Sequence, residues 1–174
     1  MDIKNYIVIK SLTEERKKPL ICAILLSVII LLSFSALFAQ NEQIKEKELI
    51  KQVIQTAYVD GLCNNADEEA VKNGFHPSFE LLSAGNGNTL WKLPIYNWIE
   101  IAKEGEAKGN KYSFQNEHTT VKFLFIDIAG NVAVAKIEFY EGKELNFIDY
   151  LSLMKFGDAW KIVSKMAHRV EKEN

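Results

Sequence analysis

The chain has 174 residues, of which 48% are hydrophobic and 25% are charged, and its formal net charge is −2. An acidic balance without a basic patch gives no support for a nucleic-acid partner. The three histidines and two cysteines show no metal-ligand spacing, so we expect neither a zinc site nor another metal. The sequence indicates no cofactor.

Residues 1–39 have the pattern of an export segment, with five basic residues in the first 18 positions followed by the apolar run "LICAILLSVIILLSFSALF". The run is close to the length that spans a bilayer. We therefore expect either a signal peptide cleaved at Ala39-Gln40 or an uncleaved membrane anchor over residues 20–38. Because basic residues stay in the cytoplasm, both alternatives place the rest of the chain in the periplasm or outside the cell. Membrane contact is expected only through this segment.

Residues 40–174 are long enough for one domain with its own hydrophobic core. They contain 20 acidic and 16 basic residues, a net charge of −4. Cys63 is the only cysteine in this part, which excludes a disulfide within the domain.

Three helices are predicted in the first half of the domain. From Glu42 to Cys63, apolar residues recur at steps of three and four, which is typical of an amphipathic helix. A short second helix is expected over Ala66–Asn73, with three acidic residues at its positive end. Pro94 opens a third helix, "PIYNWIEIAKEG", which ends near Gly105.

Strands are predicted between the second and third helices and through the second half. Glu80–Ala84 and Thr89–Leu93 flank "GNGN" and form a short hairpin. In four longer segments, apolar and polar residues alternate with period two, and residues typical of tight turns separate the segments. This pattern indicates an antiparallel meander within an α+β fold. These segments are Glu117–Ile128, Val132–Tyr140, Leu145–Phe156 and Ala159–Val170.

Two stretches carry a resemblance to a known family. The stretch "FIDYLSLMKFGDAWKIVSKMAH" (residues 147–168) resembles the end of the family named putative lumazine-binding. "FHPSF" (residues 75–79) is similar to a Phe-His-Pro segment that follows the second helix in such domains. The resemblance places the chain in the nuclear transport factor 2-like (SnoaL-like) superfamily. It implies a cone-shaped roll in which a strongly bent antiparallel sheet wraps three N-terminal helices around an open pocket.

Asp149 lies within the apolar run "FIDYLSLMKF" and needs a partner if it is buried. If Gly157-Asp158 is a two-residue hairpin loop, Asp149 lies opposite Met166 and diagonal to His168 on the interior face. A carboxylate and an imidazole that share an apolar concave face form the kind of pair that performs general acid–base catalysis. This register makes Asp149 and His168 candidate catalytic residues.

A three-residue loop gives the alternative register, because a shift of one residue moves every side chain to the other face. Asp149 would then form an ordinary surface ion pair with Lys161 or Lys165.

Other polar and aromatic residues are candidates for the pocket. The hydroxyl of Tyr58, on the apolar stripe of the first helix, is a candidate donor to a developing oxyanion. Trp91 and Trp98 flank the expected pocket mouth and can stack on a ring. The candidate ligand contacts are His76, Trp91, Trp98, Tyr150 and Met166.

Three functions are compatible with this sequence, because the fold alone does not determine activity. The first is an exported domain that binds a small apolar or aromatic molecule in the cone. The second is a cofactor-free isomerase, dehydratase or cyclase that uses Asp149 with His168 or His76, and Tyr58. The third is an interaction module that forms a homodimer through the outer face of its sheet, as related folds often do.

Overall fold

The computed structural model describes residues 40–109 and 117–171. The chain divides into two compact units, residues 1–44 and residues 45–174, and the fold below is that of the second unit. The export segment predicted over residues 1–39 lies outside the described residues. Within the described ranges, no helix has both the length and the hydropathy needed to cross a membrane.

The three predicted helical regions are present, but the first one changes type along its length. Its α-helical turns reach residue 53 and continue as a π-helix of 11 residues, η1 (Ile54–Asn64). In α2 (Glu68–Gly74), the side chain of Asp67 caps the first turn by accepting hydrogen bonds from two backbone N–H groups. The third helix, α3 (Ile95–Ala107), begins directly after Pro94.

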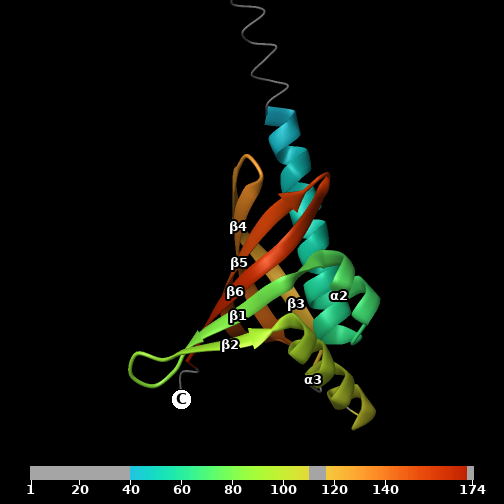
Figure 1. The fold of residues 1–174 in the computed structure, drawn as a ribbon, viewed down its shortest axis with the longest axis vertical. Coiled ribbons are helices and arrows are strands. Elements are labelled where there is room, and N and C mark those ends of the chain that lie inside the picture. Colours follow the sequence, from blue (N-terminus) through green and yellow to red (C-terminus); the bar gives the residue numbers. More distant parts are fainter. Residues whose placement is uncertain (1–39, 110–116, 172–174) are drawn as a thin grey trace, which may run out of the picture. The chain divides into compact units, whose positions relative to one another are not determined.

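The strands form one six-stranded sheet in the order β2-β1-β6-β5-β4-β3 (Figure 1). The predicted meander is confirmed, since β3 to β6 pair in succession and all antiparallel. The expected antiparallel sheet is present with one exception, which makes it a mixed sheet: β1 runs parallel to β6. No hairpin joins β1 to β6, so turn composition does not determine their relative direction. The strand bounds are β1 Phe75–Ala84, β2 Leu90–Pro94, β3 Thr119–Ala129, β4 Val132–Glu141, β5 Glu144–Phe156 and β6 Ala159–Arg169.

Local shifts of register accompany the curvature of this sheet, which is visible in Figure 1. Four strand pairs contain such a shift: β1–β6, β3–β4, β4–β5 and β5–β6. An extra residue on one strand bends that strand and increases its local twist. The sheet is therefore curved and mixed, and it stays open because β2 and β3 are its two edges.

The hydrophobic core lies between the helices and the concave face of the sheet. Close contact between η1 and α2 requires a glycine, because a Cβ atom on Gly74 would lie 2.1 Å from the Cβ atom of Ala57. The end of η1 is attached to β3 by Asn64, whose side chain donates to the carbonyl of Thr119 and accepts from its N–H. The largest fully buried apolar side chains are those of Tyr58, Phe79, Ile50, Ile54, Leu62, Ile137, Leu151, Leu153 and Ile162.

Candidate functional site

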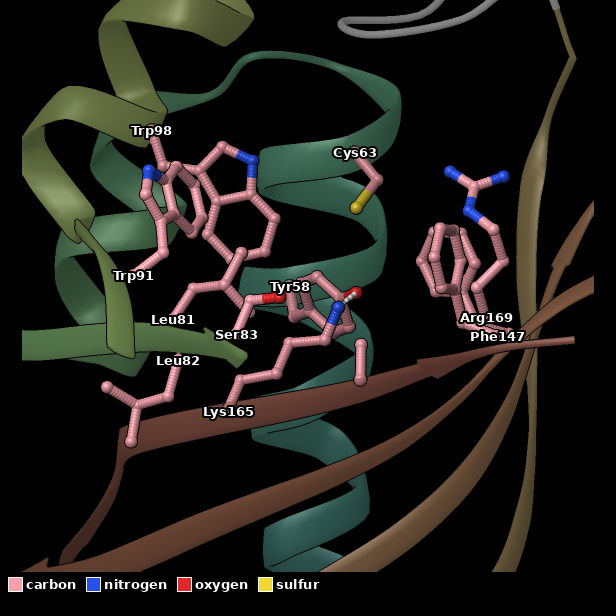
Figure 2. A pocket seen from close by; sticks show the side chains of 12 residues that line it. Tyr58, Cys63, Leu81, Leu82, Ser83, Trp91, Trp98, Phe147, Lys165 and Arg169 are labelled. Atoms are coloured by element: carbon pink, nitrogen blue, oxygen red, sulfur yellow. Dashed lines mark hydrogen bonds between the residues drawn. The ribbon is translucent and has the colours of Figure 1, made fainter. Parts of the chain in front are cut away.

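A cavity of about 450 Å³ opens on the concave side of the sheet. Its walls are mainly aromatic and aliphatic, and they come from η1, the β1–β2 hairpin, α3 and strands β4 to β6. Figure 2 shows Trp91 and Trp98 on one side and Phe147 and Arg169 on the other, with Tyr58 and Lys165 between them. The predictions that Trp91, Trp98 and Tyr58 lie at a pocket agree with this geometry.

Tyr58 reaches the cavity from the π-helical part of the first helix. Hydrogen bonds between residues five apart define this geometry, as in the bond from the N–H of Asn65 to the carbonyl of Asp60 at 2.9 Å. The side chains of Gln55 and Asp60, also five residues apart, form a hydrogen bond at 3.0 Å. A π-helix is rare in proteins and occurs frequently at functional sites. The sequence pattern predicted an ordinary amphipathic helix here.

Three buried polar groups meet at the inner end of the cavity, and we call them the Asp149–Tyr58–Lys165 cluster. The hydroxyl of Tyr58 donates a hydrogen bond to Oδ2 of Asp149 at 2.8 Å. The ammonium Nζ of Lys165 lies 2.9 Å from the same oxygen and 2.5 Å from the Tyr58 hydroxyl. The side chain of Asp149 is fully buried, and that of Lys165 is 7% exposed. Tyr58 and Lys165 line the cavity, whereas Asp149 does not.

The predicted pairing of Asp149 with Met166 and His168 is wrong, although the predicted two-residue loop is correct. Phe156 pairs with Ala159 as the loop requires. Between Ser152 and Leu153, however, the register shifts by one residue, and Asp149 pairs with Ala167. His168 pairs with Ile148 instead, and its side chain is exposed.

The same shift turns Lys165 inward. The alternative register correctly named Lys165 as a partner of Asp149, but it placed the pair at the surface, whereas the pair is buried. The residues of the turn do not reveal a bulge farther along the strand. Neither the two-residue nor the three-residue loop therefore predicted a buried lysine. The one available signal was Asp149 itself, since a buried carboxylate calls for a cationic or donor partner.

Burial dominates the electrostatics of the cluster. It raises the pKa of Asp149 above its usual value, although the hydrogen bonds and charge of Lys165 and the hydrogen bond from Tyr58 act in the opposite direction. Burial, followed by the negative charge of Asp149, raises the pKa of Tyr58 well above its usual value. Tyr58 therefore remains a protonated hydrogen-bond donor. Burial also raises the pKa of the Cys63 thiol, so Cys63 lines the cavity as a small apolar residue and not as a nucleophile.

Aromatic rings surround the ammonium group of Lys165. Its Nζ lies 4.8 Å from the ring centroid of Tyr58, 5.3 Å from that of Trp98, 5.5 Å from that of Phe139 and 5.9 Å from that of Phe147. The faces of these rings attract a cation, which helps to offset the cost of its burial. The other carboxylate oxygen, Oδ1 of Asp149, is buried without a hydrogen-bond partner in the part of the chain that the structure describes.

The remaining predicted residues lie away from the cavity. His76 stacks on Phe156, and its Nδ1 accepts a hydrogen bond from the N–H of Ser78. Tyr150 and Met166 pair across β5 and β6, and both side chains are exposed on the outer face of the sheet. None of these lines the cavity, and neither does His168.

The lining residues Phe147, Lys165 and Arg169 were not among the predicted site residues. Phe147 and Arg169 are paired across β5 and β6, and the guanidinium carbon lies 4.8 Å from the centroid of the phenylalanine ring. Basic residues at alternate positions normally mark the solvent side of a strand, so the sequence of β6 did not indicate that a lysine and an arginine line the cavity. Among residues 40–109 and 117–171, no group of three His, Cys, Asp or Glu side chains could hold a metal ion.

Comparisons with known proteins identify the family. The model of the family described as "Putative lumazine-binding" matches residues 45–168. No curated protein matches the chain.

Solved structures show the same fold. An NTF2-like protein of unknown function from Shewanella baltica is 22% identical, with a TM-score of 0.57, over 74% of this chain and 97% of that one. A second, from Silicibacter pomeroyi, is 14% identical, with a TM-score of 0.56, over 74% and 98%. A third, from Methylobacillus flagellatus, is 21% identical, with a TM-score of 0.53, over 73% and 94%. The chain therefore belongs to the putative lumazine-binding family and has the NTF2-like cone fold.

Proposed function

We propose that the domain binds a small planar aromatic molecule in its cavity. The observation that carries this proposal is a cavity of about 450 Å³ with aromatic walls and a small polar cluster at its inner end. Small-molecule sites typically have volumes of about 300–1,000 Å³, with mostly apolar walls and a few polar groups that fix orientation. Trp91, Trp98 and Phe147 supply ring faces, while Lys165 supplies a hydrogen-bond donor.

The family description supports the choice of a first ligand. Lumazine, which that description names, is a flat bicyclic heteroaromatic with carbonyl oxygens and ring nitrogens. Its rings can stack on indole, and one of its carbonyls can accept a hydrogen bond from the Lys165 ammonium, whose third N–H is not used by Asp149 or Tyr58. It therefore suits both the walls and the inner end of the cavity.

The arrangement favours binding over the enzymatic alternative in which Asp149 acts as a base. Asp149 contacts Tyr58 and Lys165 and does not itself line the cavity. His168 and His76, its expected partners in catalysis, both lie elsewhere. A base must come within hydrogen-bond reach of the proton that it removes. We infer that Asp149 instead neutralises the charge of Lys165 and fixes the orientation of the Tyr58 hydroxyl.

Calorimetric titration of the full-length protein with lumazine tests this proposal. We expect saturable binding at one site, and the Trp91→Leu variant should bind about three- to tenfold more weakly, since an aromatic pair contributes roughly 0.5–1.5 kcal/mol. Tyr150→Leu is the matched control, because Tyr150 is an exposed aromatic residue on the outer face of the sheet. Equal weakening in both variants would refute the assignment of this cavity, and no binding by the parent protein would refute lumazine as its ligand.

We further propose that the domain works outside the cytoplasm. Support comes from the sequence of residues 1–39, where basic residues precede a long apolar run. The mass of the protein recovered from its own host would distinguish cleavage at Ala39-Gln40 from an intact anchor. Recovery of the intact chain in the cytoplasmic fraction would refute export.

A further inference from the structure

The charged residues that line the cavity are both basic. Lys165 lies at the inner end and Arg169 lies beside Phe147, while no aspartate or glutamate is among the lining residues. This contrasts with the domain as a whole, in which acidic residues outnumber basic ones. A concave surface lined by one sign of charge favours a ligand of the opposite sign.

The two positive charges differ in how they are compensated. Asp149 lies 2.9 Å from Lys165 and balances its charge within the protein. Arg169 has no acidic partner within ion-pair distance among the residues that the structure describes, and its guanidinium group lies over the face of Phe147. Among the residues that the structure describes, the cavity therefore has one positive charge in excess, and that charge is on Arg169.

Arg169 is placed to meet the edge of a ring bound in the cavity. Figure 2 shows its guanidinium group beside Phe147, facing the cavity from the side opposite Trp91 and Trp98. A flat ligand that lies between these aromatic walls extends one edge toward the guanidinium group. The planar fork of an arginine side chain matches a carboxylate, with two parallel N–H···O bonds.

We propose that the ligand of this cavity is a planar aromatic monoanion of the carboxylate type, whose negative edge is bound by Arg169. This inference rests on the function proposed above and specifies its ligand class. A single negative charge balances the excess charge of Arg169, whereas a second one would lack a counter-ion, because Asp149 already neutralises Lys165. Stacking on the tryptophans would supply affinity, and the arginine would supply the preference for charge.

A matched pair of ligands tests the proposal in the full-length protein: 2-naphthoate, which is anionic, and 2-naphthamide, its neutral analogue of almost the same shape. We expect calorimetry to show about tenfold or more tighter binding of the naphthoate, as a hydrogen bond to a charged group contributes more than a neutral one. The Arg169→Gln variant should lose most of this preference while it keeps its affinity for the naphthamide.

A control variant separates a specific contact from a general effect of charge. Lys136→Gln removes one positive charge from a side chain that contacts the exposed Tyr150 ring, so the preference for the naphthoate should persist. Loss of the preference in both variants would overturn a specific role for Arg169.

The outcomes also distinguish the two proposals. Equal affinity for the two naphthyl ligands, or binding of lumazine but of neither of them, would overturn the anionic ligand class and leave the aromatic pocket standing. Failure of all three ligands to bind would overturn both.

Discussion

At the scale of single residues, the buried ion pair between Asp149 and Lys165 is the main departure from an ordinary apolar core. A buried pair is costly to desolvate, and the cost is recovered only through close geometry and further hydrogen bonds. Tyr58 donates one such bond to the carboxylate, and four aromatic rings surround the ammonium group. The pair gives the cavity a polar inner end with almost no net charge.

We expect the two members of this pair to depend on one another. Asp149→Asn or Lys165→Met alone should lower the free energy of unfolding by about 3–5 kcal/mol, because each leaves a buried charge without its counter-ion. The double variant should recover a large part of that loss, since it removes both charges. Urea denaturation measures all four proteins. If the loss of unfolding free energy in the double variant equals the sum of the two single losses, the two residues are not coupled.

Glu46, which lies outside the cavity, should make the stability of the protein depend on pH. Hydrogen bonds from Lys155 at 2.7 Å and from the indole of Trp160 at 2.6 Å hold its pKa below the usual 4.5. A carboxylate whose pKa is lowered by folding stabilises the protein above its unfolded pKa and loses that contribution as the pH falls through its folded pKa.

The stability difference between the parent protein and Glu46→Gln should therefore be largest near neutral pH and shrink below about pH 4. Urea midpoints of both proteins between about pH 3 and pH 7 measure this. A difference that stays constant with pH would show that Glu46 contributes only through packing.

At the scale of elements, the contact between η1 and α2 depends on Gly74. In Gly74→Ala, the new methyl group would overlap Ala57, and overpacking of this kind costs typically about 1–3 kcal/mol. The second change Ala57→Gly should relieve the overlap and recover part of the loss. Thermal unfolding of the single and double variants measures this. A Gly74→Ala protein as stable as the parent would mean that the helices separate without cost.

The elements were predictable from sequence because their signals are local. Apolar periodicity and turn residues placed three helices and six strands close to their observed bounds, except that β1 begins at Phe75, before the predicted start at Glu80. The parallel pairing of β1 with β6 was not predicted, because it joins segments far apart in the chain. The π-helical turns of η1 were also missed, since a few widened turns preserve an apolar stripe.

The candidate site was predicted only in part, because one extra residue in β6 shifts its pairing with β5 beside Ser152. Tyr58, Trp91 and Trp98 were placed at a pocket from their positions on predicted elements, and they line the cavity. The partner of Asp149 depended on register, and the shift beside Ser152 replaced His168 with Lys165. A bulge is set by the curvature of the whole sheet, so residues near the turn did not reveal it.

At the scale of the whole molecule, the outer face of the sheet exposes large apolar side chains on β5 and β6. These belong to Tyr150, Met154, Phe156 and Met166. We propose that this face joins two copies of the chain, because exposed apolar side chains gathered on one face are typical of interaction sites.

Light scattering coupled to size-exclusion chromatography should give the mass of a dimer for the parent protein. Met166→Glu places a charge in the proposed contact and should shift the mass toward that of a monomer. A monomeric parent protein would contradict the proposed contact and leave the cavity proposal unaffected.

A crystal structure of the protein with bound lumazine would show whether the cavity around Tyr58 and Lys165 is the binding site. We expect the ring between Trp91 and Phe147, with a carbonyl oxygen within hydrogen-bond distance of the Lys165 ammonium. A ligand bound beside His76, or on the outer face near Tyr150, with the cavity left empty would contradict it.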